Sequence, residues 1–154
     1  MATSKFLRVV ILSGVLSAFS SFAFAETCSV EIEANDQIQF NKKAIPIAAD
    51  CTEVELTLKH VGKLPVTAMG HNWVLIKTAD FQPVATAGMS AGAANNYVPK
   101  GDARVLASTK LVGGGESTSI KFPVSKLTKG EDYTFFCSFP GHSGLMKGKL
   151  TFGA

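Results

Sequence analysis

The sequence predicts an all-β domain, either a sandwich or a barrel, and two observations support this prediction. Apolar and polar residues alternate in four segments, as they do in strands that bury one face, namely residues 30–34, 54–58, 120–124 and 146–152. Turn-forming residues interrupt the chain at Asn35-Asp36, Val61-Gly62, Gly113-Gly114-Gly115 and Lys129-Gly130. Short strands separated by such turns are typical of β-sandwiches and barrels.

The first 25 residues are predicted to be a secretory signal peptide. Lys5 and Arg8 give a basic start, Val9–Ala18 is an apolar run, and Ala23-Phe24-Ala25 places small residues before a cleavage site. A membrane anchor is the alternative, but the run is shorter than the roughly 20 residues that span a bilayer. We therefore expect cleavage after Ala25 and a single domain over residues 26–154.

The strands are expected in the following order along this domain. Each is recognised by the apolar residues that would share one face: Val30, Ile32 and Ala34; Val54, Leu56 and Leu58; the run Trp73–Lys77; Ile120, Phe122 and Val124; Tyr133, Phe135 and Cys137; and Met146, Gly148, Leu150 and Phe152.

One segment, Asp80–Tyr97, departs from the strand pattern because it is rich in alanine and glycine. Asp80 is a candidate helix cap, and Pro83 would fall in the first turn, where its missing N–H costs little. Gly88 and Gly92 lower the helix propensity. We expect a partly helical insertion packed on the edge of the sandwich.

Charge excludes some classes of partner. The chain has 15 basic and 12 acidic residues, and loss of Lys5 and Arg8 with the signal peptide leaves 13 against 12. No basic cluster interleaved with aromatic residues is present, so we expect no nucleic-acid partner. No later stretch is long and apolar enough to predict a membrane span.

The three cysteines, Cys28, Cys51 and Cys137, are an odd number for an exported protein. At most two of them pair. A bridge between Cys28 and Cys51 would close a modest loop and stabilise the fold by roughly 3 kcal/mol. Cys137 would then be the unpaired thiol.

A thiol, an imidazole and a thioether lie close together at Cys137, His142 and Met146, with the spacing Cys-x4-His-x3-Met. Pro140-Gly141 permits a tight loop that turns the three side chains toward one point. Gly70-His71-Asn72 offers a second imidazole. Thiolate and thioether favour Cu(I) and imidazole is acceptable to Cu(II), so this donor set is typical of a blue-copper electron-transfer site with one copper ion.

These motifs resemble the azurins, bacterial periplasmic proteins of the cupredoxin family, over nearly the whole mature chain. The resemblance rests on Met69–Leu75, on Thr109–Leu111, on Phe135–Gly148 and on the early pair Cys28 and Cys51. It implies an eight-stranded Greek-key β-sandwich with a short helical insertion.

The resemblance also implies roles for residues at the metal. Cys137, His71 and His142 would form a trigonal plane around copper, with Met146 as a weak axial ligand and the Gly70 carbonyl oxygen opposite. The backbone amides of Asn72 and Phe139 would donate to the cysteine sulfur, and the Asn72 side chain would tie the two ligand loops together. Such bonds orient the ligands and tune the metal.

Seven residues match an apolar ring that surrounds the exposed edge of the second histidine in azurins: Leu64, Ala68, Met69, Met89, Phe139, Pro140 and Gly144. Scattered surface apolarity is the ordinary alternative. We favour a docking patch, because several of these residues flank ligands and electron-transfer encounters are small. Ser108 departs from the family pattern, since several azurins carry a surface histidine there.

Two further residues are predicted to belong to the core. His60 continues the inward face of Val54, Leu56 and Leu58, so we expect a buried histidine with satisfied hydrogen bonds rather than a ligand. In azurins the matching histidine lies near the copper and influences pH behaviour. Trp73 is expected in the core.

The resulting hypothesis is a periplasmic monomer that carries single electrons by cycling Cu(II)/Cu(I). Its partners would be transient redox proteins such as c-type cytochromes or periplasmic reductases. It would not be an enzyme, because filled ligand positions leave no open site for substrate.

Three alternatives remain open. A periplasmic copper store or chaperone would use exposed Met/His-rich tracts, which three histidines and three mature methionines do not form. A nucleophilic enzyme would use Cys137 and a histidine but leaves Met146 unexplained. Zinc uptake at the same donors would be a loading artefact.

Overall fold

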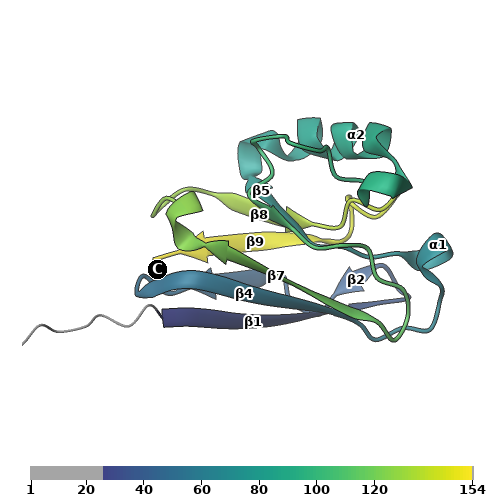
Figure 1. Cartoon of the computed structure of the whole chain (residues 1–154), viewed down its shortest axis with the longest axis horizontal. Helices are drawn as coiled ribbons and strands as arrows, with labels where there is room; N and C mark the ends of the chain where they lie inside the picture. Colours follow the sequence, from purple (N-terminus) through teal and green to yellow (C-terminus); the bar gives the residue numbers. More distant parts are fainter. Residues whose placement is uncertain (1–25, 154) are drawn as a thin grey trace, which may run out of the picture.

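A computed structural model describes residues 26–153, which form two β-sheets packed face to face (Figure 1). The four-stranded sheet has the order β2 (Gln39–Phe40), β1 (Glu26–Asn35), β4 (Cys51–His60) and β7 (Ser117–Pro123). The five-stranded sheet has the order β3 (Ala44–Ile47), β9 (Lys147–Phe152), β8 (Tyr133–Phe136), β5 (Val74–Lys77) and β6 (Ala107–Ser108). The predicted sandwich is confirmed. The described residues contain nine strand segments rather than eight, and two of them, β2 and β6, have only two residues.

Alternating strands bury one face each, as predicted. In β4, Val54, Leu56 and Leu58 are fully buried, while the residues between them reach solvent. β1 pairs in parallel with β4 over nine residue pairs, so the inner faces of the two strands line up. The main core lies between the sheets and includes Trp73, whose ring stacks on those of Phe122 and Phe135.

The predicted insertion contains helix α2 (Phe81–Ala91), followed by the short 3-10 turn η2 (Ala93–Asn95). Val84 and Ala85 of α2 pack against Val74, Ile76 and Phe136 in a second, smaller core. The helix therefore covers the outer face of the five-stranded sheet, rather than its edge as expected. This cover explains why β5 and β8 are apolar at consecutive positions, since both of their faces are buried.

Asp80 and Gly88 of the insertion behave differently from what the sequence predicts. Asp80 occupies the position before α2, but its side chain makes no capping hydrogen bond, so the predicted capping role is wrong. Gly88 lowers helix propensity, yet a Cβ there would lie 2.3 Å from the Tyr97 carbonyl oxygen. The helix therefore needs glycine at this position in order to approach the loop beside it.

The remaining elements are short. They are α1 (Val66–Met69) and the 3-10 turns η1 (Thr78–Asp80) and η3 (Val124–Lys126). Val124, expected to extend a strand, lies instead in η3, because β7 ends at Pro123. No helix in residues 26–153 has the length and apolar character to cross a membrane.

Cys28 and Cys51 form a disulfide, as expected, and Cys137 is a free, buried thiol. The bridge joins the starts of β1 and β4, which pair along their length. The predicted signal peptide, residues 1–25, lies outside the described residues.

Candidate metal centre

The register of the five-stranded sheet brings His71 and Cys137 to the same end of the molecule. β5 and β8 are antiparallel, and Val74 lies opposite Phe136. His71 precedes β5 and Cys137 follows β8, so both leave the sheet in the same direction. His142 lies in the loop that joins β8 to β9. Two strand ends and one tight loop therefore deliver all three side chains to one place.

The three donor atoms form a compact, buried cluster. Cys137 Sγ lies 3.8 Å from His71 Nδ1 and 3.7 Å from His142 Nδ1. All three donor atoms lie within 4.8 Å of one another. Cys137 and His71 have no exposed surface, and His142 is 4% exposed. The Gly70 carbonyl oxygen is 3.9 Å from the sulfur, so the predicted carbonyl also borders the cluster.

Met146 is fully buried, and its backbone is hydrogen-bonded to the backbones of Cys137 and His142. Its carbonyl accepts the Cys137 N–H at 2.9 Å, and its own N–H donates to the His142 carbonyl at 2.8 Å. The tight loop is thus closed at both ends. The role of the Met146 thioether as an axial ligand stays a prediction.

A hydrogen bond sets the orientation of the His71 ring. His71 Nε2 donates to the Asn35 carbonyl at 2.9 Å, which leaves Nδ1 facing the Cys137 sulfur. The backbone of His71 is held as well, because it exchanges two hydrogen bonds with Val112 at 3.0 and 2.9 Å. A partner on the far ring nitrogen is the usual way in which a metal-binding histidine is oriented.

His60 is the buried histidine that the sequence predicts, and it does not belong to the donor cluster. Its Nδ1 accepts the Gly62 N–H at 3.0 Å, and its Nε2 donates to the Met69 carbonyl at 2.9 Å. Both ring nitrogens therefore have hydrogen-bond partners. The ring stacks on His71 with centroids 4.5 Å apart, so it supports that ligand candidate from behind.

Asn72 ties the two ligand loops together, as the resemblance implies. Its Oδ1 accepts the Ser138 N–H at 2.9 Å, and its Nδ2 donates to Ser138 Oγ at 2.8 Å. The same Nδ2 donates to the Asn96 carbonyl at 2.8 Å. Sequence reasoning missed Ser138 and Asn96. Ser138 adjoins Cys137 and could have been singled out, whereas no sequence signal links Asn96 to the centre.

Burial shifts the protonation of all three donors toward their neutral forms. It raises the pKa of the Cys137 thiol to about 12, although the Asn72 and Phe139 backbone N–H groups donate to the sulfur and oppose this rise. Burial lowers the pKa of His71 to about 4 and also lowers the pKa of His142. The metal-free protein therefore presents two neutral imidazoles and a protonated thiol at neutral pH.

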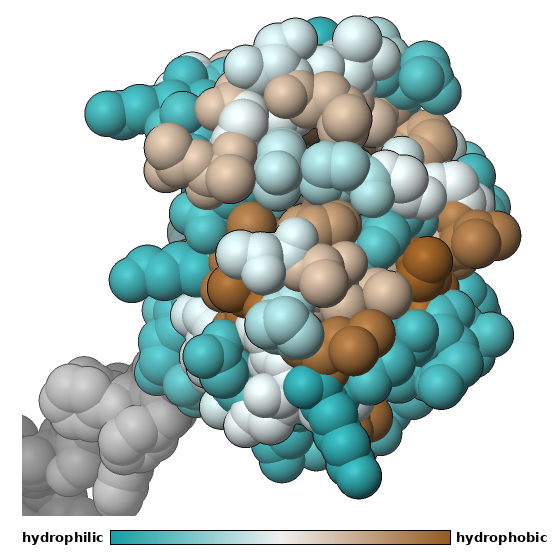
Figure 2. All heavy atoms as spheres, turned by 90° about the vertical axis from the view of Figure 1, so that its right-hand side faces the viewer, coloured by the Kyte–Doolittle hydropathy of each residue, from teal (hydrophilic) through white to brown (hydrophobic). Residues whose placement is uncertain are grey.

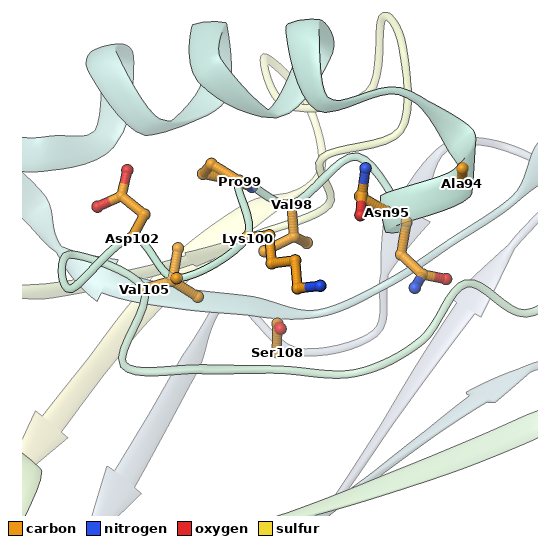
Figure 3. Close-up of a pocket in the computed structure, with 10 residues that line it drawn as sticks. Ala94, Asn95, Val98, Pro99, Lys100, Asp102, Val105 and Ser108 are labelled. Carbon is orange, nitrogen blue, oxygen red and sulfur yellow. The ribbon is translucent and has the colours of Figure 1, made fainter.

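The chemistry of this donor set fits copper. Imidazole nitrogen and thiolate sulfur are soft or borderline donors, and Met146, whose backbone is hydrogen-bonded to Cys137 and His142, is fully buried. No carboxylate belongs to the cluster within residues 26–153, whereas Mg²⁺ and Ca²⁺ prefer oxygen ligands. A hollow beneath α2, lined by residues such as Asn95, Lys100, Asp102 and Ser108, lacks thiol, thioether and imidazole groups (Figure 3). It is not a candidate for the same metal.

The predicted docking residues come from three segments around this end of the sandwich. Leu64, Ala68 and Met69 lie in or just before α1, Met89 lies in α2, and the other three lie in the loop between β8 and β9. All seven are exposed or half-buried. Figure 2 faces this end and shows apolar atoms across its middle, with hydrophilic atoms around them.

Comparison with known proteins agrees with the geometry. Residues 26–153 match the model of the family described as copper binding proteins, plastocyanin/azurin family. The azurin of Bordetella pertussis is 54% identical over 94% of this chain and 97% of its own length. The azurin of Pseudomonas aeruginosa is 50% identical over 94% of this chain and 98% of its own length.

A solved structure extends the comparison to the fold. The azurin Az-iso2 of Methylomonas sp. strain J superposes with a TM-score of 0.79 at 47% identity, covering 81% of this chain and 97% of its own. With the His71, Cys137 and His142 cluster in place, the chain belongs to the plastocyanin/azurin family of copper-binding proteins and is a blue-copper electron-transfer protein that binds one copper ion.

Proposed function

We propose that His71, Cys137 and His142 hold the copper ion, and that the Met146 thioether and the Gly70 carbonyl complete its surroundings. One observation carries this assignment: a fully buried thiol lies between two imidazole nitrogens, at 3.7 and 3.8 Å. The exposed face nearest the ion would be the docking patch formed by the seven apolar residues named above.

The bound ion supplies a one-electron couple between Cu(II) and Cu(I). The chain's own residues keep the donors still. His71 is held by Asn35 and Val112, and the loop from Cys137 to Met146 is closed by two backbone hydrogen bonds. Donors that move little on electron arrival need little reorganisation, which favours fast transfer.

We propose that the protein is a carrier and not an enzyme. Its candidate ligands are buried and hydrogen-bonded to their neighbours, and four side chains with one carbonyl would fill the surroundings of the metal. A catalytic metal site keeps an open position for substrate or water. The same burial argues against a copper store or chaperone, which needs donors that a second protein can reach.

We further propose export to the periplasm with removal of residues 1–25. Matches to the Bordetella and Pseudomonas azurins extend over 145 residues, which is more than the 129 residues after Ala25. Those relatives therefore carry a comparable leading segment. The partners would be c-type cytochromes or periplasmic reductases that meet a monomer transiently through the apolar patch.

A copper titration tests the ligand assignment. The purified protein is titrated with Cu(II), and the visible spectrum is followed through ascorbate reduction and reoxidation. We expect an intense thiolate-to-copper band that saturates at one copper per chain and bleaches reversibly.

The same titration on variants separates ligands from neighbours. Cys137→Ser removes the thiolate, so the band should be absent, whereas Ser143→Ala in the same loop should keep it. A wild-type complex without the band, in which Cys137 still reacts with an alkylating agent, would overturn the assignment. Rapid transfer of copper to a mild chelator would bring the storage function forward.

A further inference from the structure

We propose that Asn96, in the insertion after α2, is a positioning residue for the metal centre: it fixes the Asn72 amide and, through it, the loop that carries Cys137. The proposal rests on the ligand assignment above and extends it to a residue outside the ligand loops.

Asn96 and Tyr97, here called the strap, adopt an unusual backbone conformation. Both have φ of 53°, in the left-handed region that non-glycine residues seldom occupy. Asparagine tolerates this region better than most residues, but tyrosine has no such advantage. Two consecutive residues of this kind persist only where surrounding contacts hold them, and such conformations cluster at functional sites.

The strap contacts residues next to His71 and next to Cys137, as well as Leu111. The Asn96 carbonyl accepts hydrogen bonds from Asn72 Nδ2 at 2.8 Å and from Ser138 Oγ at 3.4 Å. Asn96 Oδ1 accepts the Leu111 N–H at 3.0 Å. The Tyr97 ring packs edge-on against Phe139, with centroids 5.5 Å apart.

The Asn96 carbonyl and the Ser138 N–H together fix which way the Asn72 amide points. With that acceptor present, Nδ2 turns toward Asn96 and Oδ1 turns toward the Ser138 N–H. A rotated amide would place NH₂ against the Ser138 N–H and oxygen against the Asn96 carbonyl, losing both bonds. Ser138 lies between Cys137 and Phe139. The orientation of the Asn72 side-chain amide therefore positions the backbone that carries the Cys137 sulfur and the Phe139 N–H, which donates to that sulfur.

The Asn96 side chain acts on the other ligand. Leu111, which donates to Oδ1, adjoins Val112, and Val112 is hydrogen-bonded to the His71 backbone. A single residue thus braces the His71 side and the Cys137 side of the centre. Its neighbour Asn95 does neither, because its side chain donates only to the Ala91 carbonyl at 2.9 Å and is exposed.

Two substitutions separate the side chain from the backbone. Asn96→Gly keeps the left-handed conformation and the carbonyl but removes the acceptor for Leu111. Asn96→Val also opposes the left-handed conformation, so it moves the carbonyl away from Asn72. Asn96→Asp keeps an acceptor and serves as the rescue variant, and Asn95→Gly is the matched neighbour control.

The first readout is amide hydrogen exchange in the metal-free protein, measured against the amides of β9. In Asn96→Gly the Leu111 amide should exchange about fivefold faster, as expected for one lost hydrogen bond. In Asn96→Val the Ser138 amide should accelerate by a similar factor. Asn96→Asp and Asn95→Gly should match the wild type at both amides.

The second readout is the copper-loaded protein. Asn96→Val should shift the reduction potential and the position of the blue band, while Asn95→Gly should leave both unchanged. Wild-type Ser138 exchange together with a wild-type potential in Asn96→Val would overturn the proposal. Failure of the wild type to form a blue complex would overturn the ligand assignment instead, and the metal-free exchange would still report on the strap.

Discussion

Each of the three proposed donor residues is neutral at neutral pH in the metal-free protein, and burial is the common cause. The Cys137 thiol has its pKa raised to about 12, and the His71 imidazole has its pKa lowered to about 4. His142 is shifted in the same direction as His71. The imidazoles are therefore ready to bind a metal at neutral pH, and the thiol alone must lose a proton.

This protonation pattern predicts the pH dependence of copper binding. At pH 6 to 7.5, copper should displace about one proton per chain, because only Cys137 gives one up. The apparent affinity should then fall about tenfold for each pH unit of acidification, since protons compete with the metal for the thiolate. The measurement is Cu(II) binding against a competing chelator across this pH range, with proton release followed by an indicator in weak buffer.

Release of a second proton on copper binding would mean that a histidine of the site is protonated before copper binds. If His142 or His71 titrated at the ordinary histidine pKa of about 6.5, the slope would approach two below that pH. A slope of about 1.5 or more between pH 6 and 6.5 would contradict the buried, neutral imidazoles. Lys63→Ala, an exposed cation in the loop before α1, should leave the slope unchanged and controls for general charge effects.

Sequence alone predicted that His71, Cys137 and His142 would cluster, but not all of the residues that hold them in place. Cys137, His142 and Met146 fall within one short loop, so their spacing alone predicts that they lie close together. Asn96 is different. Its contact with Asn72 depends on a left-handed backbone and on how the insertion folds back, and no local pattern encodes either.

Among the elements, the strands were the most predictable because alternation reports directly on a half-buried sheet. β3 was missed, although Ile45 and Ile47 alternate with exposed residues, because Pro46 breaks the strand pattern. β3 lies at the edge of the five-stranded sheet, where a proline can be accommodated. The position of α2 was mispredicted because its apolar residues do not specify which part of the sheet they cover.

In helix α2, the helix propensity of a residue at position 88 and the packing around it predict opposite effects on stability. Gly88→Ala should stabilise an isolated helix by about 1 kcal/mol. In the folded protein the new methyl group would meet the Tyr97 carbonyl at 2.3 Å, and that atom belongs to the backbone of the strap. We expect net destabilisation by about 1–3 kcal/mol, as for overpacking elsewhere. The measurement is the free energy of unfolding in urea.

Thr86→Ala is the matched control, because it places alanine on the exposed face of the same helix. It should leave stability unchanged or raise it slightly. If the free energy of unfolding of Gly88→Ala equals or exceeds that of the wild type, the backbone at Tyr97 can move away from α2 at little cost, and close packing does not require glycine at this position.

At the scale of the whole molecule, the disulfide and the metal centre lie at opposite ends. Cys51 begins β4 and His60 ends it, so about 30 Å of strand separates the bridge from the histidine that stacks on His71. Figure 1 shows β1 and β4 starting at the end of the sandwich away from α1. The two features should therefore contribute independently.

Removing the bridge tests that independence. Cys28→Ala combined with Cys51→Ala should lower the free energy of unfolding by about 3 kcal/mol, because the unfolded chain gains the freedom of a 23-residue loop. The blue band and reduction potential should stay at their wild-type values. Denaturant unfolding and spectroscopy of the loaded protein measure the two effects. A weakened or shifted blue band would mean that the bridge and the centre are coupled through β4.

The proposed docking patch leads to a prediction about the encounter between two molecules. In self-exchange, an oxidised and a reduced copy would face each other through the same apolar surface. Gly144→Glu places a charge there without a clash, since a Cβ at Gly144 meets nothing within 4 Å. Two like charges brought together should slow electron self-exchange by about tenfold at low salt, and added salt should restore part of the rate. NMR line broadening in mixtures of the two redox states measures the rate.

Gly144→Gln is the matched control, because its side chain has nearly the same shape as that of Gly144→Glu without the charge. It should exchange electrons much faster than Gly144→Glu, and both variants should keep the blue band. Equal rates for Gly144→Glu, Gly144→Gln and the wild type would mean that electrons leave the protein through another face.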